Sequence, residues 1–348
     1  MSETDTAPAA DRQVPQPPAG SAPRRLAERL YRLSSLFGLL AVLVLAVVFS
    51  PQRHGEVLFL TGENLANVVR AVAEIGIIAV GMTLVVLAGG IDLSVGAVLG
   101  LAATGTAVLL VEDGLPVALA VAVVLLIGLA LGVAQGFASA ALRIQPFIVT
   151  LAGLQVARGL ARIWSGGQGV AISYGEGPGQ APAVFALLGE RTFYGLVPVP
   201  ALIFAVVAGG AVLWLRLSAF ARHLYAVGGN EKAARLAGVP VRRVKVTVFA
   251  VCGVLAALAG IVHAGQLNQG SPNDGLGYEL DAIAAVVIGG TSLSGGRGSV
   301  AGTVAGALLL GVLNNVLALN GVDTNVQLLI KGFVIVAAAG LQRLRPGR

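Results

Sequence analysis

The stretch from Ala71 to Leu110 constrains the fold of this chain more than any other. It is apolar for about one membrane crossing, is interrupted at Gly89-Gly90, carries the acid Asp92 just beyond, and then becomes apolar again. Backbone groups in a bilayer must be hydrogen-bonded within their own segment, so chains cross as helices. An interruption is tolerated only inside protein or beside a water-lined cavity. An ionisable residue at such a point indicates a transport pathway.

The composition extends this interpretation to the whole chain. Of the 348 residues, 56% are hydrophobic and only 11% are charged, with a mean hydropathy of +0.86. Soluble domains carry about 25% charged residues. Short alternating segments, the mark of a membrane β-barrel, are missing from the sequence. The predicted fold class is therefore all-α, a polytopic membrane protein.

We expect about ten transmembrane helices, with broken half-helices among them. The apolar segments are 33–49, 65–88, 94–111, 116–141, 147–164, 196–217, 246–265, 281–290, 299–319 and 325–342. A full crossing needs about 20 residues, so the eighth segment is expected to be a half-helix. A disordered, Pro- and Ala-rich tail is predicted at 1–32 and a short tail at 343–348, on either side of a transmembrane domain at 33–342.

Basic residues predict the orientation. When the N-terminus is placed in the cytoplasm, most of the 23 Lys and Arg residues fall in cytoplasmic segments. The positive-inside rule then places both termini of this multi-pass membrane protein in the cytoplasm. Two outer segments, 165–195 and 266–280, are long enough to receive a substrate-delivering partner, although they are equally well explained as solvated connectors.

A short similarity indicates an internal repeat. VVLAGGIDLSVG at 85–96 and AVVIGGTSLSGG at 285–296 align Gly89 with Gly289 and Gly90 with Gly290. Broken helices at corresponding places in two halves are typical of transporters. Chance is the competing explanation in a chain with 48 glycines. Both breaks fall on the cytoplasmic side in the predicted topology, which implies a parallel relation or a miscounted half-helix.

The longest cytoplasmic loop, 216–245, is predicted to form a small helical knob. Asn230 can cap a helix that ends at Gly238, before Pro240, and Glu231 and Arg235 have the i,i+4 spacing of an ion pair. The knob is either a peg that fits a groove of a partner or a membrane-surface loop with basic anchors. Its residues are Asn230, Glu231, Lys232, Ala233, Arg235, Leu236 and Gly238.

Polar side chains inside apolar spans need partners. Arg70 and Glu74 are spaced to pair along one helix, Arg158 and Arg162 share a helix face, and Lys331 lies in the last span. These polar groups either contact a transported solute along a pathway or form hydrogen bonds between helices. The candidates for the pathway are Asp92, Gln155, Arg158, Asn314 and Asn315.

Catalytic and metal-binding constellations are not visible. Ser94 and Ser294 lack a usable neighbouring base, His263 stands alone in its span, and the histidines have no metal-ligand spacing. The chain contains no Gly-Lys dipeptide and therefore no phosphate-binding loop. We expect no enzyme activity and no cofactor; ATP, if it drives this protein, is bound by another subunit.

Three stretches carry a resemblance to a known family. GMTLVVLAGGIDLSVGAVLGLAA, ARHLYAVGGNEKAARLAGVPVRRVK and YELDAIAAVVIGGTSLSGGRGSVAGTVAGALLLGVLNN resemble the permease of bacterial ABC sugar importers, in the ribose, arabinose and xylose branch. The similarity runs from about residue 60 to 342. It implies a type II importer-like permease of the bacterial cytoplasmic (inner) membrane that pairs with a second permease chain, identical or related. It also implies a cytoplasmic ABC ATPase, which would receive 230–238 as a coupling helix, and a periplasmic or lipid-anchored sugar-binding protein.

The expected function is thus ATP-driven import of a monosaccharide, with the power supplied by a separate ATPase. One alternative is a related permease for branched-chain amino acids or nucleosides. Another is a transporter that works alone and uses Asp92, Glu74 or Lys331 to couple transport to an ion gradient.

Overall fold

The computed structural model describes residues 34–53, 55–189 and 197–343. The chain divides into two units, Met1–Ser34 and Ser35–Arg348, and the description below concerns the second. The predicted tail at 1–32 lies outside the described residues, as does the end of the chain from residue 344.

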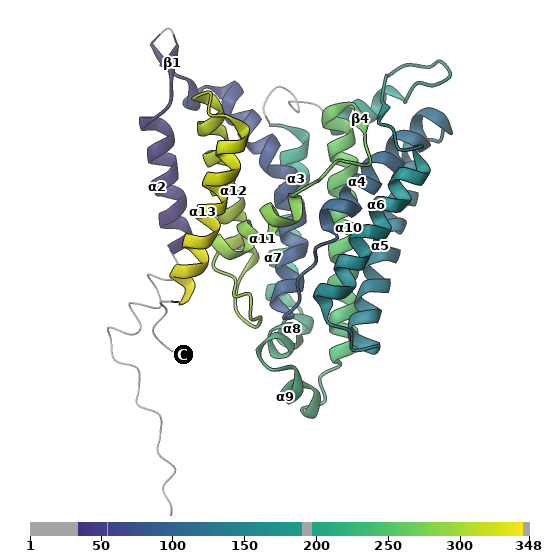
Figure 1. Cartoon of the computed structure of the whole chain (residues 1–348), viewed down its shortest axis with the longest axis vertical. Coiled ribbons are helices and arrows are strands. Elements are labelled where there is room, and N and C mark those ends of the chain that lie inside the picture. Colours follow the sequence, from purple (N-terminus) through teal and green to yellow (C-terminus); the bar gives the residue numbers. More distant parts are fainter. Residues whose placement is uncertain (1–33, 54, 190–196, 344–348) are drawn as a thin grey trace, which may run out of the picture. The chain divides into compact units, whose positions relative to one another are not determined.

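The described part of the chain is built almost entirely from helices (Figure 1). The α-helices are α2 (Ser34–Val48), α3 (Gly62–Leu87), α4 (Val95–Ala107), α5 (Val117–Ala141), α6 (Pro146–Trp164), α7 (Val199–Leu217), α8 (Ala219–Gly229), α9 (Glu231–Leu236), α10 (Val241–Leu267), α11 (Tyr278–Ile288), α12 (Val300–Leu319) and α13 (Thr324–Arg343). Two antiparallel pairs of two-residue strands join connectors: β1 (Gln52–Arg53) with β2 (Glu56–Val57), and β3 (Val170–Ala171) with β4 (Gln269–Gly270).

Each of the ten predicted apolar segments contains a helix, which confirms the all-α polytopic class. Within the described residues, seven helices are long and apolar enough to cross a membrane: α3, α4 with its π-helical extension Val108–Glu112, α5, α6, α7, α10 and α12. α11 has only 11 residues, the length expected of a half-helix.

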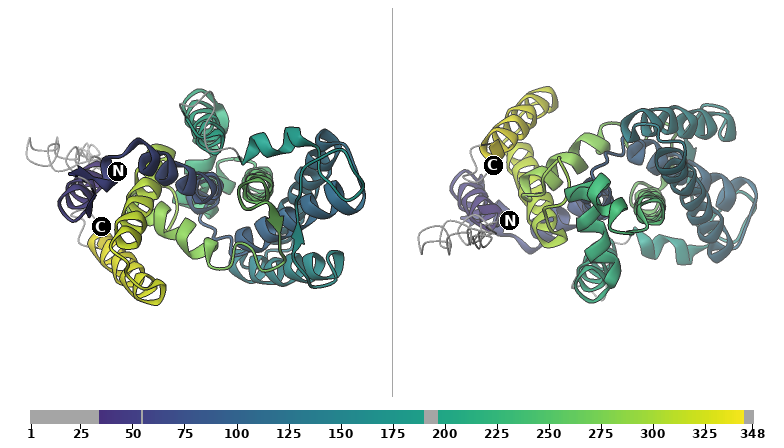
Figure 2. Two further views of the ribbon diagram at one scale, coloured as in Figure 1. Left: turned by 90° about the horizontal axis from the view of Figure 1, so that it is seen from above. Right: turned by 90° about the horizontal axis from the view of Figure 1, so that it is seen from below.

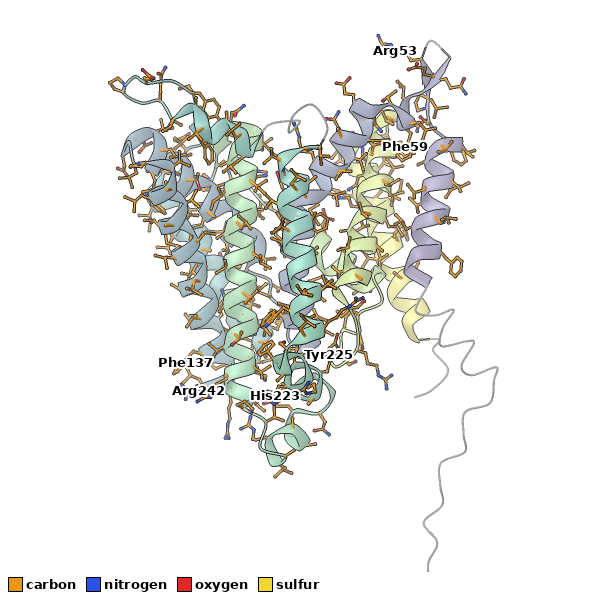
Figure 3. All side chains as sticks on the ribbon, turned by 180° about the vertical axis from the view of Figure 1, so that it is seen from behind. Arg53, Phe59, Phe137, His223, Tyr225 and Arg242 are labelled. Atoms are coloured by element: carbon orange, nitrogen blue, oxygen red, sulfur yellow. The ribbon has the colours of Figure 1, made fainter. Side chains whose placement is uncertain are left out.

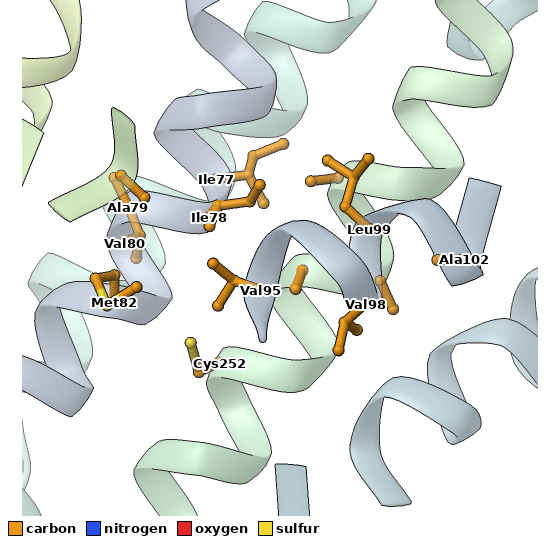
Figure 4. Packing of buried hydrophobic residues seen from close by; sticks show 14 of the residues in the cluster. Ile77, Ile78, Ala79, Val80, Met82, Val95, Val98, Leu99, Ala102 and Cys252 are labelled. Carbon is orange, nitrogen blue, oxygen red and sulfur yellow. The ribbon is translucent and has the colours of Figure 1, made fainter. Parts of the chain in front are cut away.

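The centre of the bundle is formed by α3, α4 and α10, which the views along the bundle show surrounded by the other helices (Figure 2). All residues of α4 are buried. Small and branched side chains such as Ile78, Val95 and Leu99 interlock there beside Cys252 (Figure 4). The polar residues just after the first helix break, Asp92 and Ser94, are buried by protein, as an interruption in a membrane helix requires.

Glycine makes the tightest of these contacts possible. Gly128, Gly132 and Gly136 form one stripe of α5, and a Cβ atom at any of them would collide with the backbone or Cβ atoms of α10. Helices in membranes associate through such small-residue stripes, because lipid provides no hydrophobic drive and close packing must replace it.

The outer faces of the bundle are apolar and exposed. Ile163, Val206, Leu217 and Phe333 are each at least 75% exposed. Surfaces of this kind are stable against lipid and not against water.

The two ends of the bundle differ. α8 and α9 lie at one end, called here the α9 end, together with the start of α10 (Figure 1). The β1–β2 pair lies at the opposite end, so that the labelled Arg53 is far from His223 and Arg242 (Figure 3).

Candidate transport and coupling site

The knob at the α9 end has well-defined termini. The Asn230 side chain accepts a hydrogen bond from the Ala233 amide at 3.0 Å, and Gly238 adopts the left-handed conformation with φ +78°. α9 occupies Glu231–Leu236 and Ala237 is its C-cap, so the helix ends shortly before Gly238, the end predicted from the sequence. Asn at the N-cap and Gly beyond the C-cap satisfy the free backbone groups of so short a helix.

Ion pairs brace the knob from one side. The Glu231 carboxylate accepts hydrogen bonds from Arg235 at 2.8 Å and from Lys245 of α10 at 2.6 Å. Burial acts to raise the pKa of Glu231. The hydrogen bonds and charges of Lys245 and Arg235 outweigh that effect, so this pKa lies below its ordinary value. The sequence indicated the Arg235 pair by its spacing, but not the Lys245 pair, which depends on how α10 packs.

The opposite side of the knob is exposed. Leu236 is 91% exposed, and Ala233 is also exposed, whereas Ala234 is buried beneath them. An isolated, protruding leucine on a capped turn can serve as an aliphatic anchor that fills a pocket of a partner surface.

A second short helix, α8, connects the knob to the bundle. Only the knob itself was predicted to be helical within the loop 216–245. The signal for α8 was present, however, because Ala221, Leu224 and Val227 recur every third residue and are all buried. Trp214 at the end of α7 stacks on Phe220 at 4.7 Å between ring centroids and thereby fixes the entry into α8.

Both predicted breaks are interruptions between helices. α3 ends at Leu87 and α4 begins at Val95; α11 ends at Ile288 and α12 begins at Val300. The terminating glycines with positive φ are Gly89 (+81°) and Gly290 (+85°), so Gly89 corresponds to Gly290 and not to Gly289 as aligned in the sequence. The sequence alignment pairs Leu87, the last residue of α3, with Val287, but α11 continues to Ile288. The helix ends are therefore offset by one residue between the two motifs.

A similar turn follows each break. The Ser94 amide donates to the Asp92 carboxylate at 2.9 Å, and the Ser294 amide donates to the Ser292 hydroxyl at 3.3 Å. A side-chain oxygen that binds the amide two residues later is a common local turn. The two motifs therefore share local geometry as well as sequence.

Asp92 is enclosed by protein in this conformation. It is 2% exposed and also accepts a hydrogen bond from the Ser94 hydroxyl at 2.6 Å, while Gln135 of α5 bonds to that hydroxyl at 2.9 Å. Thr150 of α6 donates to the Ile91 carbonyl at 3.2 Å. This network attaches the broken segment to α5 and α6.

The other pathway candidates do not converge on one site. Gln155 is exposed on α6, whereas Arg158 on the same helix is buried. Asn315 exchanges two hydrogen bonds with Asn64 of α3, at 2.8 and 3.0 Å. The Oδ1 atom of Asn314 is buried and has no hydrogen-bond partner in the described part of the chain.

Arg158 binds the connector that precedes α11. Its Nη1 atom donates to the carbonyl oxygens of Pro272 and Asp274, at 2.5 and 2.6 Å. The connector packs on α4 at Gly96 and Gly100, where a Cβ atom would collide with it. The guanidinium group thus takes the place of backbone hydrogen bonds that a non-helical segment lacks.

The predicted Arg70–Glu74 pair is wrong, and so is the isolation of His263. Glu74 is 6% exposed and accepts from His263 Nδ1 of α10 at 2.8 Å and from the Tyr278 hydroxyl of α11 at 3.2 Å. His263 Nε2 lies 3.7 Å from the Asp274 carboxylate. Glu74 faces the bundle interior, so it pairs across helices. Sequence spacing contained no sign of this cluster, because its members are up to 204 residues apart.

Lys331 also has a partner that spacing does not reveal. Its ammonium group lies 3.1 Å from the Asp281 carboxylate, which joins α13 to α11. A paired lysine of this kind explains how a charge is tolerated in the last apolar helix.

Comparison with known proteins identifies the class. Residues 64–339 match the family model described as branched-chain amino acid transport system / permease component. The chain is 42% identical over 319 residues to the ribose import permease protein RbsC of Bacillus subtilis (strain 168), an alignment that covers 90% of this chain and 93% of that protein. No solved structure matches.

Two further relatives come from Escherichia coli (strain K12). The ribose import permease protein RbsC is 41% identical over 89% of this chain and 92% of its own length. The xylose transport system permease protein XylH is 34% identical over 86% and 88%.

An apolar helical bundle with two interrupted helices, matched to these proteins, is a polytopic membrane permease. The chain belongs to the permease family of binding-protein-dependent importers that includes the ribose and xylose permeases, as the sequence motifs predicted.

Proposed function

We propose that this chain is the transmembrane subunit of an ABC importer that moves a monosaccharide, a ribose-like pentose or a hexose, into the cell. The observation that carries the proposal is the 42% identity to a ribose permease over nine-tenths of the chain. The family description names branched-chain amino acids, but the relatives compared above are named for ribose and xylose. We therefore favour a sugar over an amino acid or a nucleoside.

ATP is bound by a separate cytoplasmic ATPase in this proposal. The chain has no Gly-Lys dipeptide, and its Gly-rich segment 289–298 contains no lysine, so it lacks the residue that a phosphate-binding loop requires. The capped and braced α9, with Leu236 exposed at its tip, is the surface that docks in the ATPase.

The α9 end is the cytoplasmic end. Arg222, Arg235, Arg242, Arg243 and Lys245 all lie in or beside the segment 219–245, and the positive-inside rule places such a cluster in the cytoplasm. Both termini are then cytoplasmic, and the β3–β4 connectors face outward, where a periplasmic or lipid-anchored binding protein delivers the sugar.

The pore is completed by a second permease chain, identical or related. Gln155 is the candidate that lies exposed on the most polar of the long apolar helices, α6, and we assign it to the pathway wall. Asp92, Arg158 and Asn315 are occupied by internal hydrogen bonds, so we assign them to bracing the broken segments in this conformation. Asn314, whose Oδ1 atom has no partner among the described residues, is kept as a pathway candidate.

Reconstitution tests the proposal. The permease, its ATPase and its binding protein in liposomes are expected to concentrate labelled ribose or another pentose or hexose only when ATP is supplied on the side of the ATPase. Uptake of leucine instead of sugar would contradict the substrate class. Concentrative uptake by the permease alone, driven by an ion gradient, would contradict the whole proposal.

Docking is tested separately by reversing the ion pair of the knob. The double change Glu231→Arg and Arg235→Glu places two cations, at 231 and 245, against each other and should abolish co-purification of the ATPase without affecting membrane insertion. Arg222→Ala, which removes an exposed cation of α8 outside the knob, is the matched control. Normal co-purification of the reversed variant would remove α9 as the docking element.

A further inference from the structure

The last turn of α8 lies between the two helix breaks. A Cβ atom added to Gly228 would collide with the carbonyl group of Leu87, the last residue of α3, and would come within 2.5 Å of the Gly296 amide nitrogen, in the segment after α11. Figure 1 shows α8 beneath the end of α3. One glycine thus brings the helix that carries the knob into backbone contact with both interrupted regions.

The two breaks are also bonded to each other at this point. The Gly296 amide donates to the Leu87 carbonyl at 3.0 Å. A Cβ atom at Gly295 would lie 2.8 Å from the Gly228 carbonyl oxygen and 3.0 Å from the Gly89 backbone. We call the backbone cluster of Leu87, Gly89, Gly228, Gly295 and Gly296 the glycine junction.

A side chain of α8 adds a further bond to the same segment. The Tyr225 hydroxyl donates to the Gly298 carbonyl at 3.0 Å. Tyr225 is visible near the α9 end in Figure 3. The Gly-rich segment 289–298 is therefore held to α8 at two successive turns of that helix.

Contacts made by backbone alone transmit displacement well. Side chains absorb small shifts by changing rotamer, whereas packed backbone has no such freedom. Gly89, Gly295 and Gly296 have φ values of +81°, +83° and +69°, conformations that other residues adopt only with strain. α8 continues through the cap residue Asn230 into α9, so no flexible linker separates the knob from the junction in this described segment.

We propose that the glycine junction transmits movement of α9 to both helix breaks at once, and that Gly228 is a positioning residue for transport. The inference rests on the proposed function, in which α9 docks in an ATPase. It explains why two breaks far apart in sequence meet beside the same short helix: a single displacement of α8 moves the end of α3 and the segment after α11 together.

The substitution Gly228→Ala tests the junction. It inserts one methyl group between three backbone segments, and overpacking of this kind should lower ATP-driven ribose uptake by about tenfold or more. Because Leu236 and the ion pairs of α9 are unchanged, the ATPase should still co-purify with the permease and hydrolyse ATP. The expected signature is therefore ATP hydrolysis without uptake.

Gly229→Ala is the matched control. Gly229 is the next residue of α8 and has no positive φ, and a methyl group added there would have no described atom of another segment within 4 Å. Both substitutions improve the intrinsic helix propensity of α8 equally, so propensity cannot account for a difference between them. Uptake by Gly229→Ala should match that of the unchanged protein.

Tyr225→Phe provides a second, milder variant in case Gly228→Ala does not accumulate in the membrane. It removes only the hydrogen bond to Gly298 and should reduce uptake per ATP hydrolysed while leaving ATPase association intact. Unchanged transport by Gly228→Ala would overturn the proposed role of the junction. If that variant does not fold, unchanged transport by Tyr225→Phe would do so.

Two further outcomes separate the junction from the proposed function. Loss of ATPase association in Gly228→Ala but not in Gly229→Ala would overturn the junction, because the defect would then be in docking. A wild-type complex that neither binds an ATPase nor imports a sugar contradicts the proposed function itself.

Discussion

The carboxylate of Glu74 on α3 lies 2.8 Å from Nδ1 of His263 on α10, in a position where both side chains are more than nine-tenths buried. The pair joins the two long central helices, and Tyr278 and Asp274 extend it to the connector before α11. Removing one member of a buried, hydrogen-bonded pair costs more than the pair contributes, because the other polar group is left buried without its partner.

His263→Ala should therefore destabilise the protein by about 3–5 kcal/mol, whereas Arg70→Ala should have little effect. Thermal unfolding in detergent, followed by the exposure of the buried Cys252 thiol, measures both. Equal destabilisation by the two variants would contradict this prediction and would support an Arg70–Glu74 pair instead.

The stability of α9 should depend on pH through the Glu231 carboxylate. The folded pKa of Glu231 is below its ordinary value of 4.5, so its ion pairs stabilise α9 fully above that value, and the stabilisation is lost as the pH falls through the lower folded pKa. Amide hydrogen exchange across 231–236 should be faster in Glu231→Gln than in the unchanged protein at about pH 7, and equal in the two under strongly acidic conditions. A difference that persists there would exclude the carboxylate as the cause.

The exposed tip of α9 should dominate ATPase affinity. Leu236→Asp is expected to weaken binding by about thirtyfold, a loss of ~2 kcal/mol, as found when an interface anchor is removed. Quantitative pull-down or surface binding measures it, with Arg222→Ala on α8, outside the knob, as the control. Near-normal affinity would show that the leucine faces lipid or solvent in the assembled complex.

Asp92 should be required through its hydrogen bonds. Asp92→Leu removes the acceptor for the Ser94 amide and hydroxyl, so buried donors are left unsatisfied at a cost of about 1–3 kcal/mol each. Uptake should be lost, and Asp92→Asn, which keeps an acceptor oxygen, should retain most of it. If Asp92→Asn is as inactive as Asp92→Leu, the negative charge itself is needed and the bracing role is insufficient.

The topology predicts the sides of two loops. Reporter fusions after Gly175 and after Lys232 should be active on opposite sides of the membrane, because the β3–β4 connectors and α9 lie at opposite ends of the bundle. Alkaline phosphatase and a cytoplasmic fluorescent reporter distinguish the sides. Signals from the same side would reject the order of spans.

Much of this protein was determined by its sequence alone. Apolar runs of about 20 residues specify helices wherever lipid is the solvent, and the capping residues Asn230 and Gly238 specify a short helix by local bonding. Gly89 and Gly290 end their helices because glycine adopts positive φ without strain. The motifs around these residues were sufficient to predict the permease family.

Tertiary structure alone decided which polar groups meet. The partners of Glu74, Arg158, Lys245 and Lys331 lie on other helices or connectors, and charge spacing along one helix predicted a partner for Glu74 that the bundle does not use. The meeting of Gly228 with Leu87 and Gly296 likewise depends on how α8 packs beneath two separate breaks. Local propensity acts over a few residues, whereas these contacts join residues that are near only after the whole chain has packed.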